Sequence, residues 1–501
     1  MQNPSMKRRL VLGSIAGTAA LGVVGTANSA SAARSGGDND EVNAALAFDP
    51  ADHTVETRTI ATGGGEVEVV YRHWHAVPYV AFPVDPEHQS LNLWEPVEID
   101  GEPVDASDAP ILFNIKVGGY MPVPIDRADL GGTNAELALA AGYVVAAPAV
   151  RGRTNVDADG VFYGKAPAAI VDLKAAVRYL RHNRGRVPGD VNRIVSTGVS
   201  AGGALSSLLG ASANSRRYDP YLEAIGAADA SDAIFAVAAY CPIADLEHAD
   251  MAHEWAFAAA PNRNTGEYVD QEIADELAEA FTAYQDSLNL RGSGRFGRLT
   301  AARLDDHLLR TYMEPAATRH LSALPESDRA AYLAANPWIT WRGSRTAGGE
   351  ASFAWDDFVQ HVQRWKGVPA FDGFTLGTFE NSLFGDEDTD KRHFTRYSLR
   401  QGTGDEGAEL EADLPEKIDL MNPMHFLGDR SRCGSRPRHW WLRTGTSDSD
   451  TSPSVMGNLV ARLENLGDEV DALMYWDGGH AVNWDAPDFI AWLGETTGRT
   501  R

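Results

Sequence analysis

The passage RIVSTGVSAGGALSSLLG, residues 193–210, constrains the fold of this chain more than any other. Residues 194–197 predict a short buried strand, residues 204–209 resume with helix-forming apolar side chains, and three glycines surround Ser200 between them. A serine on so sharp a turn lies in strained backbone, so its neighbours two positions away must lack side chains. This strand–turn–helix pattern predicts a nucleophile elbow. The alternative is a glycine-rich helix start that packs against a sheet.

Strand and helix patterns alternate on both sides of this passage. Strand-like segments come first, at residues 67–74 and 78–85. We then expect buried strands at residues 111–117, 143–150, 233–243, 439–445 and 470–476, and helices at residues 166–183, 454–467 and 486–495. Alternation of this kind implies crossover connections and a mostly parallel sheet flanked by helices.

The alternation breaks from about residue 244 to about residue 428. This stretch is rich in Trp, Tyr and charge, has helical patches at residues 271–288 and 298–313, and has no run typical of a buried strand. It predicts a large helical and irregular insertion, or lid. The expected domain organisation is a leader at 1–32, the core at 33–243, the insertion at 244–428 and the rest of the core at 429–501.

Composition excludes one class of partner. The 501 residues carry a net charge of −26 and are 44% hydrophobic, which is sufficient for a large soluble core. Binding to nucleic acid needs a basic face, so this partner is not expected. Either salt tolerance or a GC-rich genome accounts for the acidity.

The two cysteines, Cys241 and Cys433, could pair outside the cytoplasm or remain thiols. The sequence indicates no oligomeric state.

The N-terminus has the order of charges typical of an export signal. A basic KRR at residues 7–9 precedes an uncharged run at 10–33, which closes on the small residues of 30–32. This predicts a signal peptide with cleavage after residue 32 and a secreted or extracytoplasmic protein. The adjacent arginines favour the twin-arginine route. The alternative is an uncleaved membrane anchor, but the run is poor in Leu, Ile and Phe.

Two residues much later in the chain supply the base and the carboxylate that a serine nucleophile needs. Asp448 follows the expected strand at 439–445, and His480 follows the one at 470–476. The order serine, aspartate, histidine is that of the α/β-hydrolase fold, and all three positions fall on the carboxyl edge of the parallel sheet. His480 would accept the proton of the serine hydroxyl, and Asp448 would orient the imidazole. The alternative for His480 is a surface-loop histidine.

An acyl-transfer site also needs donors for the developing oxyanion. The backbone N–H of Ala201, the residue after the nucleophile, is one expected donor. The second is expected from Gly118 or Gly119, which follow the strand at 111–117, and the sequence does not decide between them.

Two clusters resemble metal sites, and we interpret both as structural or solvated. In EHADMAHEW, residues 247–255, the two histidines are five apart and do not share a helix face, and the zinc pattern HExxH is absent. In DEDTD, residues 386–390, the sixth position is Lys391 rather than the glycine of a calcium loop. No metal or cofactor is expected.

Three passages resemble the bacterial tannases, which are α/β-hydrolases with a large lid. They are residues 198–214, 221–255 and 445–451, and the likeness extends from about His53 onward. The fungal tannase and feruloyl esterase group has cysteines beside its catalytic serine and histidine. Here those neighbours are Val199 and Gly479, so the bacterial group is the better match.

The resemblance implies the same Ser200, Asp448 and His480, and it adds three substrate-binding positions. By this likeness Lys366, Glu380 and Asp450 hold the three hydroxyls of a galloyl ring. Two carboxylates can accept hydrogen bonds from adjacent phenols, and a lysine can balance their charge. On the residues alone, Lys366 and Glu380 would be interpreted as solvated lid residues.

The expected function is therefore a secreted serine esterase that releases gallic acid from gallotannins and alkyl gallates. Its partner would be a small or polyphenolic galloyl ester. The alternative within the same fold is a feruloyl or other hydroxybenzoate or hydroxycinnamate esterase. An alternative of another class is a non-catalytic binding protein on a hydrolase scaffold, which would not need all of Ser200, Asp448 and His480.

Overall fold

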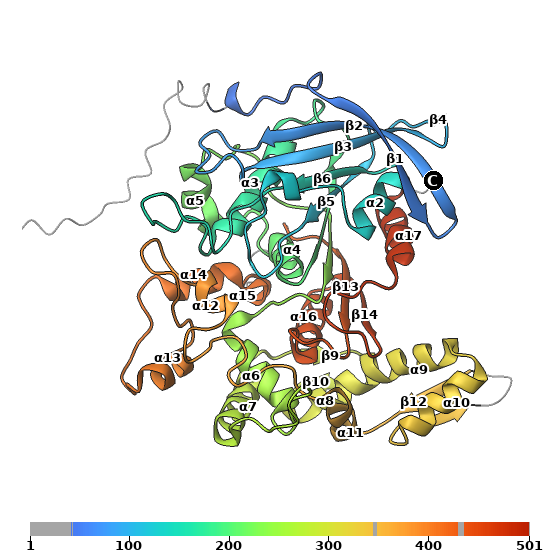
Figure 1. The fold of residues 1–501 in the computed structure, drawn as a ribbon, viewed down its shortest axis with the longest axis vertical. Coiled ribbons are helices and arrows are strands. Elements are labelled where there is room, and N and C mark those ends of the chain that lie inside the picture. Colours follow the sequence, from blue (N-terminus) through green and yellow to red (C-terminus); the bar gives the residue numbers. More distant parts are fainter. Residues whose placement is uncertain (1–41, 43, 344–347, 429–434, 500–501) are drawn as a thin grey trace, which may run out of the picture. The chain divides into compact units, whose positions relative to one another are not determined.

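A ten-stranded sheet organises the chain and places the ends of its central strands along one edge. The strands lie in the order β1-β2-β3-β6-β5-β7-β8-β13-β14, with β4 paired to β3 (Figure 1). Their bounds are β1 Thr54–Thr62, β2 Gly65–Pro78, β3 Ser90–Ile99, β4 Glu102–Pro103, β5 Pro110–Ile115, β6 Val144–Pro148, β7 Asp190–Val199, β8 Ala236–Tyr240, β13 His439–Gly445 and β14 Glu469–Tyr475.

The computed structural model describes residues 42, 44–343, 348–428 and 435–499, which belong to one compact unit, Val42–Arg501. The expected leader at 1–32 and Cys433 lie outside the described residues, so the leader and the disulfide stay predictions. Among the described residues, every helix is too short or too polar to traverse a bilayer.

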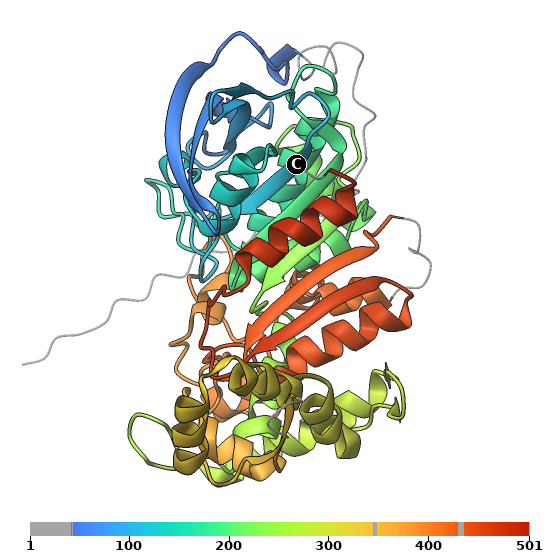
Figure 2. The same ribbon diagram turned by 90° about the vertical axis from the view of Figure 1, so that its right-hand side faces the viewer.

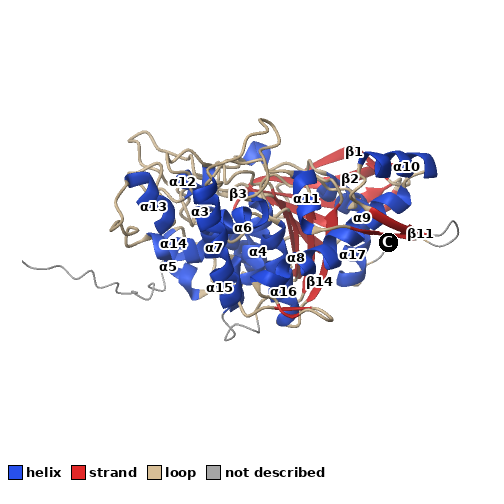
Figure 3. Ribbon diagram, turned by 90° about the horizontal axis from the view of Figure 1, so that it is seen from below, coloured by secondary structure: helices blue, strands red, loops and turns tan. Residues whose placement is uncertain are grey.

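The sheet is parallel from β6 to β14 and antiparallel from β1 to β6. The parallel part confirms the predicted mostly parallel sheet with flanking helices. Figure 3 shows helices α4 (Ala201–Ala211) and α16 (Pro453–Asn465) on one side of the strands and α17 (Ala486–Thr497) on the other. Because β5, β7, β8, β13 and β14 run in the same direction, the loops that follow them meet at one edge.

The remaining helices of the core and the lid have the following bounds: α2 Thr133–Ala140, α3 Ala168–His182, α5 Asp219–Ala224, α6 Leu246–Phe257, α7 Gln271–Ser287, α8 Ala301–Leu308, α9 Glu314–Ala323, α10 Glu326–Ala335, α11 Trp355–Val362, α12 Phe379–Leu383, α13 Arg396–Thr403, α14 Leu414–Met421 and α15 Pro423–Gly428. Helices α6 to α15 fall within the predicted insertion, and Figure 2 shows the green, yellow and orange part of the lid below the sheet. The domain boundaries at 243/244 and 428/429 stay predictions.

The lid contains short strands that the sequence pattern did not indicate. They form two hairpins, β9 (Arg291–Gly292) with β10 (Gly297–Arg298), and β11 (Thr340–Gly343) with β12 (Gly349–Ser352). Half of their residues are exposed and only Ala351 is buried, so no buried apolar run marks them.

One expected strand is wrong. Pro78 ends β2, and residues 79–85 form a loop, although Tyr79 and Val80 are buried. The N–H groups of Ala81 and Phe82 donate to the carbonyl oxygens of Gly226 and Ile225, at 3.1 and 3.0 Å, rather than to a strand. Pro78 and Pro83 have no backbone N–H group, so neither can donate to a sheet ladder. Strands β1 and β3, which pair with β2 on its two sides, were not predicted.

Candidate active site

Ser200 lies at the turn between β7 and α4, in the conformation expected of a nucleophile elbow. Its φ is 61° and its ψ is −123°, and its N–H donates to the carbonyl oxygen of Tyr240 at 3.0 Å. A Cβ on Gly198 would lie 2.3 Å from the carbonyl oxygen of Gly202, and one on Gly203 would lie 2.5 Å from that of Tyr240. The glycines are therefore required by close backbone packing around the serine.

The structure brings Ser200, His480 and Asp448 into one hydrogen-bonded chain. The Ser200 hydroxyl donates to Nε2 of His480 at 2.8 Å, and Nδ1 of His480 donates to Oδ1 of Asp448 at 2.9 Å. The same Asp448 oxygen accepts the N–H groups of Asp450 and Thr451, each at 2.8 Å. These bonds fix the carboxylate, and through it the tautomer and the orientation of the imidazole.

The surroundings of His480 favour its charged form. Burial of the ring lowers the pKa of His480, but the hydrogen bond and charge of Asp448, with a further contribution from the neighbouring Cys241, outweigh burial and raise the pKa well above its usual value. The imidazole is thus a strong base that takes up a proton readily. This is the property required of a group that accepts a proton from a serine hydroxyl.

Cys241 is a site residue that the sequence analysis considered only as a disulfide partner. It follows β8, has a φ of 39°, and is buried. Its Sγ, a carboxylate oxygen of Asp448 and a ring nitrogen of His480 all lie within 4.8 Å of one another. Its position directly after a central parallel strand could have indicated this place, because residues that follow such strands lie at the sheet edge that also holds Ser200.

The loop after β5 supplies backbone N–H groups opposite the serine helix. Gly119 and Tyr120 both have a φ of 54°, and the buried Tyr120 is held by donation from its hydroxyl to the carbonyl oxygen of Ile243 at 3.2 Å. Among the described residues, no acceptor is paired with the N–H of Gly118, Gly119, Tyr120 or Ala201. These donors are free, and Gly118 and Gly119 remain equal candidates for the second oxyanion contact.

The three residues assigned by resemblance also converge. Nζ of Lys366 lies 2.7 Å from Oδ1 of Asp450, and the other Asp450 oxygen lies 3.8 Å from Nδ1 of His480. Burial raises the pKa of Glu380, and the charge of Lys366 only partly offsets this. Burial raises the pKa of Asp450 as well, but there the contact with Lys366 prevails and the pKa is lowered. Asp450 is therefore the more firmly ionised of the two carboxyl groups.

Arg153 and Phe379 lie beside these groups and were missed by the sequence analysis. The Arg153 guanidinium stacks over the Phe379 ring at 4.6 Å, and its Nε donates to the carbonyl oxygen of Gly119 at 2.8 Å. Phe379 is 59% exposed, and its ring lies 3.6 Å from where a Cβ on Gly119 would stand. An exposed aromatic ring next to the glycine loop is suited to contact with an aromatic substrate.

Comparison with solved structures gives close matches over nearly the whole chain. A tannin acyl hydrolase in complex with ethyl gallate is 34% identical, with a TM-score of 0.78, over 90% of this chain and 98% of that one. The tannin acyl hydrolase from Lactobacillus plantarum is 34% identical, with a TM-score of 0.77, over 90% and 99%. The chain belongs to the tannin acyl hydrolase family.

Other comparisons agree with this family membership. The Fusobacterium nucleatum tannase is 33% identical, with a TM-score of 0.77, over 90% of this chain and 99% of that one. The BD-FAE family model matches residues 98–284. Esterase LipQ of Mycobacterium tuberculosis is 41% identical over 88 residues, which span 18% of this chain and only 20% of the esterase. This tannase-family member is a carboxylic ester hydrolase.

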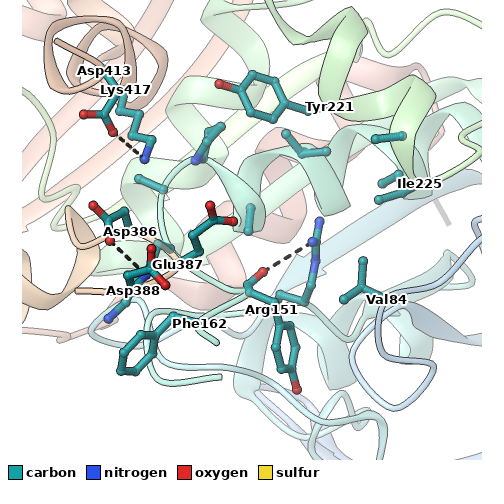
Figure 4. A pocket seen from close by; sticks show the side chains of 17 residues that line it. Val84, Arg151, Phe162, Tyr221, Ile225, Asp386, Glu387, Asp388, Asp413 and Lys417 are labelled. Carbon is teal, nitrogen blue, oxygen red and sulfur yellow. Dashed lines mark hydrogen bonds and ion pairs between the residues drawn. The ribbon is translucent and has the colours of Figure 1, made fainter. Parts of the chain in front are cut away.

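A cavity of about 530 Å³ in this tannase-family member lies apart from the site (Figure 4). It is lined by the segment after β6, by α5, by α14 and by the acidic run at 386–388, and Ser200, Asp448 and His480 are not among its lining residues. Asp386 accepts the N–H groups of Asp388 and Thr389 at 3.0 and 2.7 Å and lies 3.2 Å from Arg392. The acidic run that resembles a calcium loop is thus used in the hydrogen bonding of its own turn.

Proposed function

We propose that this enzyme hydrolyses galloyl esters to gallic acid and an alcohol, with Ser200, His480 and Asp448 as its catalytic triad. The observation that carries the proposal is the proximity of Ser200, His480 and Asp448 to the pair formed by Asp450 and Lys366. Nδ1 of His480, the middle member of the hydrogen-bonded chain from Ser200 to Asp448, lies 3.8 Å from a carboxylate oxygen of Asp450, and Asp450 is itself paired with Lys366. A complex of a family member with ethyl gallate supports the galloyl group as the acyl part of the substrate.

In the first half of the reaction, Oγ of Ser200 attacks the ester carbonyl carbon while Nε2 of His480 takes the hydroxyl proton. The carbonyl oxygen becomes an oxyanion, which the N–H groups of Ala201 and of Gly118 or Gly119 stabilise. When the intermediate collapses, the bond to the alcohol oxygen breaks and His480 gives its proton to that oxygen. The galloyl group then remains on Ser200.

In the second half, water replaces the alcohol. His480 takes a proton from the water, the hydroxide attacks the acyl carbon, and the proton returns to Oγ of Ser200 as the carboxylic acid leaves. Asp448 keeps Nδ1 of His480 protonated throughout and stabilises the imidazolium in both halves.

Recognition of the acyl group falls to Lys366, Glu380 and Asp450. The carboxyl groups of Glu380 and Asp450 accept hydrogen bonds from ring hydroxyls, and the Lys366 ammonium balances the negative charge that gathers between them. A feruloyl ester would place a methoxy group where one of these acceptors expects a donor. The arrangement therefore favours a gallate ester over the feruloyl alternative.

Turnover of methyl gallate, methyl ferulate and p-nitrophenyl acetate by the purified enzyme tests the proposal. We expect methyl gallate to be strongly preferred over methyl ferulate. A comparable rate on both methyl esters would favour the broader hydroxycinnamate esterase. Binding of gallate with no turnover of any of the three esters would favour the non-catalytic alternative.

The raised pKa of His480 predicts how activity depends on pH. Only the neutral imidazole accepts the serine proton, so kcat/KM should rise with pH as His480 loses its proton, and this rise should lie above the usual range of histidine. Asp448→Asn removes the charge that raises the pKa. The rise should then move to lower pH, while the maximal kcat falls by about 10⁴-fold. A pH profile of the variant whose rise stays at the wild-type pH would contradict this role of Asp448.

We further propose that the chain is exported and processed at its N-terminus. The basis is the order of the basic residues at 7–9, the uncharged run at 10–33 and the small residues at 30–32. Mass spectrometry of the secreted protein should find a mature chain that begins close to Ala33. An intact Met1 on the extracellular protein would support the uncleaved membrane anchor instead.

A further inference from the structure

Helix α6 directs two buried carboxylates at the lid segment that carries the substrate-binding residues. We call residues 364–382, which contain Lys366 and Glu380, the recognition segment. Asp250 and Glu254 lie four residues apart on α6, so they share one face of the helix. Both belong to the cluster at 247–255 that resembles a metal site, and both are buried.

Glu254 acts on Lys366 through Arg364. Nη1 and Nη2 of Arg364 donate to the two oxygens of Glu254 at 2.9 and 2.7 Å, and both side chains are 0% exposed. Nε of Arg364 donates to the carbonyl oxygen of Lys366 at 2.9 Å, and Nη2 donates to that of Gly367 at 3.0 Å. Because a bidentate guanidinium has a fixed geometry, Glu254 fixes the main chain at the residue whose ammonium pairs with Asp450.

Asp250 holds the next turn of the same segment. Its two oxygens accept the N–H groups of Phe371 at 2.7 Å and Asp372 at 2.9 Å. The Phe371 ring lies 4.9 Å from Nζ of Lys366, so the ammonium stands between this aromatic face and Asp450. A shift of the main chain at Phe371 would therefore move the ring against which the lysine packs.

The contact continues from Asp372 to Glu380. The fully buried carboxylate of Asp372 accepts from Nδ2 of Asn381 at 2.7 Å and from the N–H groups of Phe394 and Thr395 at 3.0 and 2.7 Å. Asn381 is the neighbour of Glu380 on the short helix α12. A chain of hydrogen bonds thus runs from α6 to the main chain at Lys366 and to Asn381, the neighbour of Glu380.

A buried ion pair is a poor source of net stability, because desolvation of both charges offsets their attraction. The contacts of Arg364 with the carbonyl oxygens at Lys366 and Gly367 instead indicate a positional role. We propose that Asp250 and Glu254 are positioning residues that set the selectivity of the enzyme for vicinal ring hydroxyls. This inference rests on the proposed function, since it assumes that Lys366 and Glu380 read those hydroxyls.

The test compares kcat/KM for methyl gallate with kcat/KM for p-nitrophenyl acetate in the full-length variants Glu254→Gln and Asp250→Asn. Each places an amide N–H₂ against a donor of the recognition segment and should displace Lys366. A displacement of about 1 Å can reduce a rate on the order of 100-fold, so kcat/KM for methyl gallate should fall by about 10- to 100-fold, mainly through KM. For p-nitrophenyl acetate, which lacks ring hydroxyls, the fall should be no more than about three-fold.

The matched control is Glu247→Gln, which makes the same chemical change at an exposed position of the same helix. It should leave both substrates at wild-type rates. If Asp250→Asn gives no folded protein, Asp250→Glu, which moves the acceptor oxygens, replaces it, and if Glu254→Gln gives none, Arg364→Lys replaces it. That variant keeps the charge and loses the bidentate fork, and it should show the same selective loss.

The outcomes separate this inference from the proposed function. If the wild type prefers methyl gallate and Glu380→Ala abolishes the preference, while Glu254→Gln and Asp250→Asn keep it, the function stands and the positional role is wrong. An equal fall on both substrates would also overturn the inference, because it would indicate a general structural role. A wild type without preference for methyl gallate would refute the proposed function itself.

Discussion

Ser200→Ala is expected to retain the fold and to lose hydrolysis of every ester tested. The serine forms the covalent acyl-enzyme through which both halves of the reaction pass, and the members of a triad act as a unit, so removal of one costs nearly as much as removal of all. We expect kcat to fall by about 10⁴- to 10⁶-fold, with the remainder due to oxyanion contacts and binding. Steady-state kinetics with methyl gallate and p-nitrophenyl acetate, with circular dichroism to check the fold, measures this loss.

Helix α4 supplies a matched control in Ser207. Its hydroxyl is buried and, among the described residues, has no hydrogen-bond partner. Ser207→Ala therefore removes one oxygen from the same helix without breaking a contact, and it should keep wild-type activity and stability. If Ser200→Ala retained more than a tenth of the wild-type turnover, Ser200 would have no part in the mechanism.

The parallel half of the sheet and the elbow were predictable because their signals are local. Buried parallel strands are continuous apolar runs, and β13 has the bounds expected from its sequence, His439–Gly445. The glycines around Ser200 are required because the backbone of neighbouring residues leaves no room for side chains, so their spacing alone indicated the turn. Asp448 and His480 could then be proposed as partners of Ser200, because residues after parallel strands meet at one edge of the sheet.

The lid was less predictable because its order depends on contacts between distant residues. Glu254 and Arg364 are separated by 110 positions in the chain, and neither neighbourhood shows a pattern that reveals the pair. Lys366 and Glu380 likewise have the composition of solvated lid residues, and only the family resemblance distinguished them. The loop at 79–85 was mistaken for a strand because apolar burial alone does not reveal where the backbone N–H groups donate.

Loss of ring hydroxyls from the substrate is expected to reduce turnover in steps. A site built to bind hydroxyls leaves its own buried polar groups unpaired when they are absent, and rejection can then reach about 10⁴-fold. Methyl gallate should be the best substrate, and protocatechuate esters, which keep two vicinal hydroxyls, should be slower. Para-hydroxybenzoate and ferulate esters should be poor, because a methoxy group brings a methyl group and an acceptor to carboxyl groups that require donors.

Glu380→Ala is expected to weaken this ranking, because the proposed function makes the buried Glu380 one of the two acceptors of ring hydroxyls. The variant should lose kcat/KM for methyl gallate while p-nitrophenyl acetate is affected far less, since the hydrogen bonds of Ser200, His480 and Asp448 do not involve Glu380. Glu387→Ala, at an exposed position of the lid that follows the recognition segment in the chain, is the control and should keep the wild-type ranking. Equal turnover of methyl gallate and methyl ferulate by the wild type would refute the galloyl site and favour the feruloyl esterase.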